Sequence, residues 1–227
     1  LAFGRIIQQA PPDFVLVENV PGLNGTVGKN IYARFLKMLN NCGFNHIYSD
    51  FLDAKNFGVP QVRKRFILIA SKVGRIVPPR KTRKIPSVRS AISKYPAIRH
   101  GEASPKYHNH EARRLLPHLK AIVGSIPKNG GSRSQIRNKQ LLLDCHKDKP
   151  KVHKDVFGRM AWNRPAPTLT CRCGDVYCGR FVHPSQNRGI SLREGAALQT
   201  FEDSYQFFGN FTQVARMIGN AVPVEFA

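Results

Sequence analysis

The chain has 227 residues, of which 41% are hydrophobic and 22% charged, values typical of a globular protein with a sizeable core. Its 36 Lys and Arg residues against 14 Asp and Glu give a net charge of +22, which predicts a polyanionic partner. No apolar run approaches the roughly 20 residues that a membrane span needs, and five cysteines without any sign of secretion indicate reduced thiols in a cytosolic protein.

The positive charge is concentrated in the middle of the chain. Residues 71–185 hold 25 Lys and Arg against 6 Asp and Glu, a net charge of +19, whereas both flanks are nearly neutral. This shift in composition predicts three parts. Residues 1–72 would form a nearly neutral first part, residues 73–184 a basic insert, and residues 185–227 a nearly neutral last part.

The first part alternates apolar runs with one helical pattern. Residues 14–17 predict a buried strand, residues 28–42 a helix that Gly43 can end, and residues 44–52 and 66–70 two further strands. This order indicates part of an α/β sheet, which three strands leave incomplete. If the strands are parallel, reacting groups are expected at their carboxyl ends.

The remaining elements are shorter. Prolines divide the basic insert, and residues 110–122 predict a helix interrupted at Pro117. Residues 129–132 (Asn-Gly-Gly-Ser) predict a loop. In the last part, Ser191 followed by Glu194 has the spacing of a capping box and predicts the start of a helix.

Two groups of polar residues follow or precede the predicted strands. Glu18 and Asn19 come directly after the first strand, where a carboxylate is placed to hold or donate a proton, although a capping role in a loop is the alternative. Arg63 and Arg65 stand two residues apart at the start of the third strand and therefore point to one face. Two guanidinium groups on one face suit a phosphate or a carboxylate, and a solvated strand edge is the alternative.

Four segments occur in an order that resembles the later motifs of the cytosine-5 DNA methyltransferase family. Glu18-Asn19-Val20 resembles the family's Glu-Asn-Val motif, and residues 60–65 (Pro-Gln-Val-Arg-Lys-Arg) its Gln-x-Arg-x-Arg motif. Residues 188–201 resemble its Arg-x-Leu-Thr-x-Arg-Glu-x-Ala-x-Leu-Gln-x-Phe helix, and residues 219–223 (Gly-Asn-Ala-Val-Pro) its closing motif. The resemblance covers both flanks, about half of the chain.

The resemblance implies a fold and an activity. The fold would be α/β, the C-terminal part of a Rossmann-like methyltransferase domain, with residues 73–184 as an inserted, mostly β or irregular target-recognition domain. Residues 1–72 would be part of the catalytic α/β domain, and residues 185–227 a hinge helix and closing segment that returns to it. The activity would be DNA cytosine-5 methylation, in which a cytosine flips out of the duplex and takes a methyl group from S-adenosylmethionine on carbon 5. The basic character of the insert fits a DNA-binding role independently.

The resemblance also implies roles for the residues that match the motifs at the base. Glu18 would act as a carboxylic acid at ring nitrogen 3 of the flipped cytosine. Asn19 would fix the loop that presents Glu18, and Arg65 would contact the base and orient Glu18. Arg63 would support the same pocket or a nearby phosphate.

Other residues would contact the cofactor or the DNA. Asn220, Ala221 and Val222 would line the cofactor pocket. Gln61 would hold its strand on the DNA side of the site.

Inside the insert, three kinds of residue are candidates for DNA contacts. Thr168 or Thr170 would offer a hydroxyl to the phosphate beside the flipped base, with an ordinary β-strand threonine as the alternative. Ser132 and Arg133 would belong to a recognition loop, because Arg can read guanine, with an exposed basic loop as the alternative.

The chain departs from the family pattern at three points. The family nucleophile lies in Pro-Cys-Gln upstream of Glu-Asn-Val, yet none of the five cysteines follows a proline, and the Phe-x-Gly-x-Gly cofactor loop is absent. Gly195 stands where the family usually has Ala, at a cost of roughly 0.5–1 kcal/mol in a helix. We therefore expect a fragment of the enzyme that is inactive in isolation.

The expected partners are double-stranded DNA, a missing N-terminal part or second subunit that carries Pro-Cys-Gln, and a cognate restriction endonuclease, in the bacterial cytoplasm at the nucleoid. Two alternatives remain open. The chain could be a natural DNA-reading specificity subunit of a split methyltransferase, or an RNA-methylating relative, although the long basic insert favours duplex DNA. Cys171, Cys173 and Cys178 lack the Cys-x-x-Cys spacing of structural zinc sites, so we expect no metal.

Overall fold

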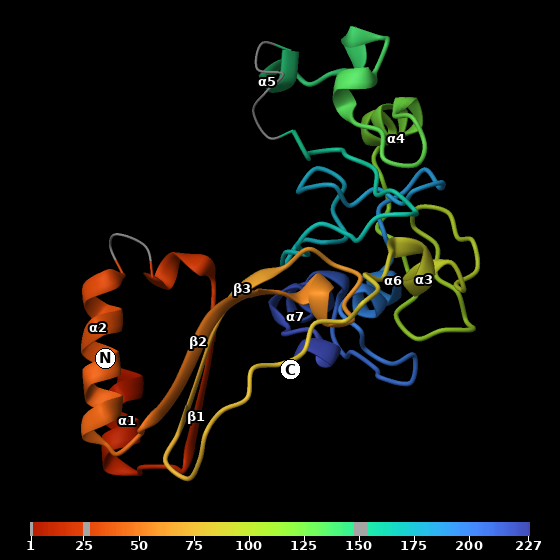
Figure 1. Cartoon of the computed structure of the whole chain (residues 1–227). Helices are drawn as coiled ribbons and strands as arrows, with labels where there is room; N and C mark the ends of the chain where they lie inside the picture. Colours follow the sequence, from red (N-terminus) through yellow and green to blue (C-terminus); the bar gives the residue numbers. More distant parts are fainter. Residues whose placement is uncertain (1, 25–27, 148–153) are drawn as a thin grey trace.

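The computed structural model describes residues 2–24, 28–147 and 154–227. The first part of the chain forms a separate lobe in which two helices cover one face of a three-stranded sheet (Figure 1). Its helices and strands are α1 (Ala2–Gln9), β1 (Phe14–Asn19), α2 (Lys29–Asn41), β2 (His46–Asp53) and β3 (Lys64–Ser71). The three strands and the α2 helix confirm the predicted order of elements, with bounds that differ by a few residues.

The strands lie in the order β1-β3-β2, and both outer strands pair with β3 antiparallel. The assumption of parallel neighbours is therefore wrong for the described strands. Because β1 and β2 both oppose β3, they run in the same direction, and their carboxyl ends meet at one end of the sheet. The register places Asn19 opposite Phe66 and Asp53 opposite Lys64, so β3 begins where β1 and β2 end.

One face of the sheet carries the core of this lobe. Leu39 of α2, Phe44 and the β3 residues Phe66 and Leu68 are buried together beneath the helices. Gly43, at φ +87°, turns the chain from α2 toward β2 in a conformation that favours glycine. The helical spacing of apolar residues in α2 thus becomes a stripe that packs on the sheet.

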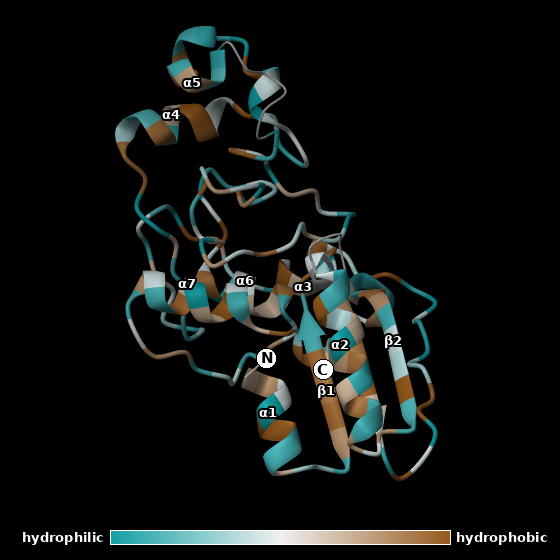
Figure 2. Ribbon diagram, turned by 90° about the vertical axis from the view of Figure 1, so that its left-hand side faces the viewer, coloured by the Kyte–Doolittle hydropathy of each residue, from teal (hydrophilic) through white to brown (hydrophobic). Residues whose placement is uncertain are grey.

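The opposite face and the outer edge of β1 are open. Phe14 and Leu16 are 61% and 62% exposed, although Figure 2 colours β1 as a hydrophobic strand. Within the described ranges, no strand pairs with the outer edge of β1. An apolar strand with a free edge is what an incomplete sheet leaves exposed.

The rest of the described chain forms short helices joined by irregular backbone and isolated bridges. The α-helices are α3 (Val88–Ile92), α4 (Pro117–Ser125), α5 (Asp144–Lys147), α6 (Leu192–Leu198) and α7 (Phe211–Asn220). The 3-10 turns of this region are η3 (Arg133–Gln135), η4 (Lys139–Leu141) and η5 (Val224–Phe226), and the first lobe contains η1 (Pro21–Asn24) and η2 (Ala54–Phe57). None of the helices in the described part is long and apolar enough to cross a membrane.

Two local predictions in this region have different outcomes. Pro117 begins α4 instead of interrupting a helix, because the first helical position needs no backbone N–H donor. The capping box is confirmed: Ser191 Oγ accepts the backbone N–H of Glu194 at 3.0 Å, and Glu194 Oε2 accepts that of Ser191 at 2.8 Å.

The closing segment packs with the basic insert. Helix α6 lies beside α7 and also packs against α3 (Figure 1). One core joins the apolar faces of α6 and α7 (Leu192, Ala196, Val214 and Ile218) to residues of the insert (Val88, Ile92, Leu169 and Phe181). The lobe made by residues 2–71 contacts this body through the segment that leads into β3, in which Gln61 and Arg63 bond to residues of the insert and of the closing segment.

Candidate active site

Glu18 and Arg65 form an ion pair at the end of the sheet where β1 stops and β3 begins. The Nε atom of Arg65 lies 2.6 Å from Glu18 Oε1, with 12% of the Arg65 side chain and 29% of the Glu18 side chain exposed. Asn19 Oδ1 accepts the backbone N–H of Val20 at 2.8 Å, which fixes the turn after β1. The structure thus brings together the three predicted residues at the carboxyl end of β1.

Arg63 points into the protein. Its side chain is buried, and its amino groups donate to the carbonyls of Leu169 at 3.0 Å, Gly219 at 3.1 Å and Ala221 at 3.0 Å. Burial, with a further contribution from Arg65, lowers the pKa of Arg63 to about 10, so the guanidinium stays charged at neutral pH. The expected contact with a phosphate is wrong for this conformation, because the side chain is buried and both of its amino groups are used on backbone carbonyls.

Asp53 explains why Arg63 and Arg65 diverge. Asp53 Oδ1 accepts the backbone N–H of Arg63 at 3.0 Å, which holds this residue outside the strand pairing that begins at Lys64. Sequence reasoning missed Asp53, although a signal was present: it is a carboxylate at the end of the second strand, as Glu18 is near the end of the first.

Gln61 is fully buried and holds three segments together. Its Oε1 accepts the backbone N–H of Leu169 at 3.0 Å, and its Nε2 donates to Gln199 Oε1 at 2.9 Å and to the carbonyl of Leu198 at 3.3 Å. These contacts support the expected role in holding the strand. A direct contact between Gln61 and DNA is excluded by its burial, and we correct that part of the expectation.

Thr168 and Thr170 are exposed on either side of buried Leu169. The Thr168 hydroxyl donates to the carbonyl of Val62 at 2.7 Å, which ties this segment to the residue between Gln61 and Arg63. Both threonines line a pocket of about 600 Å³ together with Arg180 and Asp155. The Thr168 proton is thus used on the backbone, whereas the exposed Thr170 hydroxyl, which accepts the backbone N–H of Arg172, keeps a proton to donate beside a basic side chain.

The predicted recognition loop has a different shape from the one expected. Arg133 is only 4% exposed, so it does not present its guanidinium to a base edge, and we correct that expectation. Ser132 begins η3, where its backbone N–H donates to Gln135 Oε1 at 2.8 Å. The residue that sequence reasoning missed is Arg180, which donates to the carbonyls of Gly130 and Gly131 at 3.1 and 3.2 Å.

Asn220 lies at the C-terminal end of α7 with its side chain exposed, and the contacts found among the described residues include none for its amide. Its neighbours are fixed: the carbonyls of Gly219 and Ala221 accept from Arg63. Ala221 and Val222 are half-buried. An exposed amide on a rigid backbone can donate to and accept from a polar ligand.

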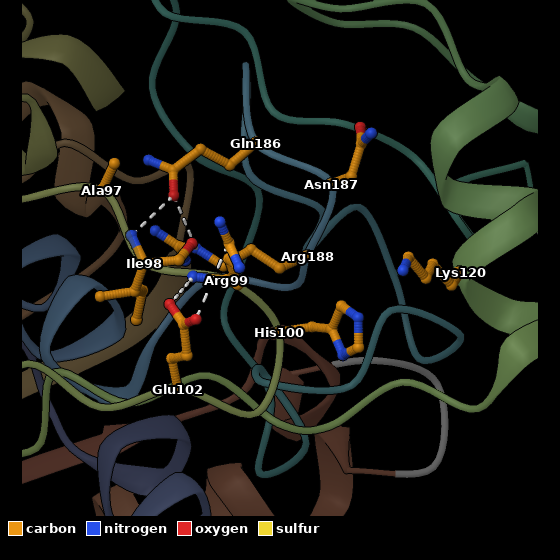
Figure 3. A pocket seen from close by; sticks show the side chains of 9 residues that line it. All are labelled: Ala97, Ile98, Arg99, His100, Glu102, Lys120, Gln186, Asn187 and Arg188. Atoms are coloured by element: carbon orange, nitrogen blue, oxygen red, sulfur yellow. Dashed lines mark hydrogen bonds and ion pairs between the residues drawn. The ribbon is translucent and has the colours of Figure 1, made fainter.

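A second pocket, of about 460 Å³, lies within the basic body between residues 97–102, α4 and residues 186–188. In Figure 3 the Lys120 side chain points from α4 toward His100, and Arg99 is paired to Glu102. None of the residues that match the family motifs at Glu18, Arg65 or Asn220 lines it.

The described part of the chain holds no cluster of three or more His, Cys, Asp or Glu side chains that could bind a metal ion. All five cysteines are free thiols, of which Cys173 is buried. Burial raises the pKa of the Cys173 thiol to about 12, which makes it a poor nucleophile.

Comparison with known proteins gives a consistent result. The family description "C-5 cytosine-specific DNA methylase" matches residues 1–227. The type II methylase M.HgiDII of Herpetosiphon aurantiacus is 37% identical over 98% of this chain and 64% of its own length. The type II methyltransferase M1.BsuMI of Bacillus subtilis is 32% identical over 98% of this chain and 51% of its own length. The chain thus spans between half and two thirds of these relatives.

Solved structures share the fold. A DNA modification methyltransferase encoded within an Escherichia coli prophage superimposes with a TM-score of 0.65 at 23% identity, over 98% of this chain and 69% of that one. A Spodoptera frugiperda DNMT2 mutant superimposes with a TM-score of 0.56 at 16% identity, over 99% of this chain and 67% of that one. At this level of identity, these neighbours establish the α/β fold alone.

Proposed function

Since the chain belongs to the C-5 cytosine-specific DNA methylase family, we propose that it forms the carboxylate-bearing and DNA-reading part of a DNA cytosine-5 methyltransferase. The observation that carries this proposal is the ion pair between Glu18 and Arg65 at the carboxyl end of β1. It supplies a positioned acid beside a cation at an accessible edge of the sheet.

The chemistry follows from the electron density that builds up on the cytosine ring during the reaction. Attack of a nucleophile on carbon 6 increases electron density at ring nitrogen 3, so a proton shared with that atom lowers the barrier. Glu18 would provide the carboxyl group there. Arg65 holds one oxygen of Glu18 at 2.6 Å, which leaves the second oxygen to meet the base.

S-adenosylmethionine would supply the methyl group that carbon 5 receives. The part of its site in this chain is Asn220, whose exposed amide stands on a backbone that Arg63 fixes on both sides. The half-buried side chains of Ala221 and Val222 would pack beside the cofactor. These residues fit a polar cofactor and form one wall of its pocket.

The DNA would lie across the basic insert. The net charge of +19 in residues 71–185 favours a polyanion, and the exposed hydroxyls of Thr168 and Thr170 lie in one pocket with Arg180. Arg99 and Lys120 add exposed cations at the second pocket. We assign residues 73–184 to target recognition on this basis.

The nucleophile and most of the cofactor site would come from polypeptide outside this sequence. No cysteine of the chain follows a proline, and the matched relatives are about one and a half to two times as long as the part that this chain covers. The free edge of β1 and the exposed Phe14 and Leu16 offer the surface on which that polypeptide would complete the sheet.

The proposal is tested by methyl transfer in the complete protein, that is, this chain with the polypeptide that carries Pro-Cys-Gln. We expect labelled methyl groups to enter DNA cytosines, and Glu18→Gln to lower kcat about 100- to 10,000-fold, because a carboxamide cannot give up a proton. Residues 1–227 alone are expected to transfer none.

Asp144→Asn is the control, since Asp144 is an exposed carboxylate of α5 that is paired with Lys147 and lies outside the motifs. It should leave kcat unchanged. An unaltered kcat in Glu18→Gln, or methyl transfer by residues 1–227 alone, would contradict the proposal.

The alternative of a split enzyme is decided by the intact mass of the native protein. A mass well above the 25.5 kDa of this sequence means one longer enzyme. A mass near that value means a DNA-reading subunit, whose partner must then carry the nucleophile.

A further inference from the structure

Arg63 joins two segments that the proposed function assigns to different ligands. Its Nη1 donates to the carbonyl of Leu169, the residue between Thr168 and Thr170. Its Nη2 donates to the carbonyls of Gly219 and Ala221, the two residues that flank Asn220. A single guanidinium therefore holds the backbone on the DNA side and the backbone on the cofactor side.

The two segments are also in direct contact. A Cβ atom added to Gly219 would lie 2.2 Å from the carbonyl oxygen of Thr170 and 2.4 Å from the backbone nitrogen of Cys171. Only a glycine allows α7 to approach the threonine segment this closely. A shift of either segment must therefore move the other.

Two buried glutamines reinforce the connection. Gln199 Nε2 donates to the carbonyls of Ile218 at 2.6 Å and Ala221 at 3.3 Å. Gln61 bonds both to Gln199 and to the backbone N–H of Leu169. We call the side chains of Gln61, Arg63 and Gln199 the Arg63 cluster. Because these groups have no access to water, losing one bond leaves a buried polar atom unsatisfied.

We propose that Arg63 is a positioning residue that couples the binding of DNA at Thr168 and Thr170 to the binding of cofactor at Asn220. The proposal rests on the proposed function, because it takes its two ligands from there. Arg63 touches neither ligand and acts through the backbone that it holds. By thermodynamic linkage, DNA tightens cofactor binding by the same factor by which cofactor tightens DNA binding.

The test measures that factor in the complete protein. The probe is S-adenosylhomocysteine, which cannot transfer a methyl group, and its Kd is measured with and without a saturating duplex that the wild-type enzyme methylates. For the wild type, we expect the duplex to lower this Kd about 5-fold or more, within the usual range of coupling between sites.

Arg63→Lys is the informative variant, because it keeps the charge but a single ammonium cannot reproduce the guanidinium fork. We expect the duplex to change the Kd of S-adenosylhomocysteine less than about 2-fold in this variant. Arg113→Lys is the control. Arg113 also contacts α7, but at its N-terminal end, where it donates to Thr212 Oγ1 at 2.8 Å, and it pairs with Asp175 of the insert at 2.9 Å. It should retain the wild-type factor.

A second measurement needs no variant and covers the case in which Arg63→Lys does not fold. In the wild-type protein without cofactor, duplex DNA should slow amide hydrogen exchange in the peptide that contains residues 217–224. Unchanged exchange there, or a wild-type factor in Arg63→Lys, would overturn the coupling. A wild type that methylates no DNA would instead overturn the proposed function.

Discussion

Arg188 and Glu194 form a buried ion pair in which both amino groups of the guanidinium meet the carboxylate. Nη1 lies 2.7 Å from Oε2 and Nη2 lies 2.7 Å from Oε1, and neither side chain is more than 1% exposed. Burial alone would raise the pKa of Glu194, but the hydrogen bonds and the charge of Arg188 outweigh it and hold the pKa below its usual value. The pair fixes the start of α6 to the backbone of residues 188–191.

Removal of one partner should be costly. Glu194→Gln leaves the Arg188 charge buried without compensation, so we expect the free energy of unfolding to fall by about 3–5 kcal/mol. Urea unfolding of the complete protein measures it. The control is Glu202→Gln, at an exposed carboxylate shortly after α6. It should change the free energy of unfolding by no more than about 0.5 kcal/mol.

The stability should also depend on pH through His183. Burial, chiefly, lowers the pKa of His183 to about 4, and Nδ1 accepts the backbone N–H groups of Ser185 and Gln186 at 3.2 and 3.0 Å. The folded protein therefore keeps this imidazole neutral. Between about pH 6.5 and pH 4 the unfolded chain binds the proton and the folded chain does not, so stability rises with pH across this window.

From pH 7 to pH 5, this effect should remove about 2 kcal/mol from the free energy of unfolding. Glu194 acts in the same direction, but only as the pH falls through the acidic range of carboxyl groups. His183→Asn keeps an acceptor near Nδ1 and cannot titrate, so its stability should fall less over this interval. An equal loss in wild type and variant would show that other groups cause the dependence.

Gly195 offers a stabilising substitution. A Cβ atom there would meet Cys173 Sγ and Ile218 Cγ2 at 3.6 Å, which is ordinary van der Waals contact, within α6. Gly195→Ala should therefore raise the free energy of unfolding by about 0.5–1 kcal/mol, because alanine loses less backbone entropy in a helix. Thermal unfolding of the complete protein measures this gain.

The opposite result is expected at Gly219, where the carbonyl of Thr170 occupies the place of a side chain. Gly219→Ala should destabilise the protein by at least about 1–3 kcal/mol, because the backbone must move apart. Equal effects of the two substitutions would mean that helix propensity alone decides the stability at both positions.

Binding to duplex DNA should weaken steeply with salt. Residues 71–185 carry a net charge of +19, and each phosphate that a protein neutralises adds about 0.9 to the slope of log K against log salt. We expect a slope of magnitude about 5 or more, measured by fluorescence anisotropy between 50 and 200 mM salt. A slope near zero would exclude an electrostatic interface.

Local sequence patterns predicted those helices, strands and caps that depend on residues close together in the chain. The apolar runs of β1, β2 and β3, the helical spacing of α2 and the capping box of Ser191 and Glu194 depend on neighbours a few residues away. The motifs around Glu18 and Arg65 could also be found in the sequence. The antiparallel order of the sheet could not, because periodicity does not encode which strands pair.

The sequence by itself therefore determined the family, the basic charge of residues 71–185 and the residues that meet at the carboxyl end of β1, because residue types at short spacing specify each of them. Only the tertiary structure decided that Arg63 turns inward and that Arg133 is buried. The carbonyls that Arg63 holds lie 106 to 158 residues away along the chain, and no local pattern specifies such a contact. Burial makes the difference: two arginines in one motif share a sequence signal, but the one without access to water must satisfy its donors within the protein.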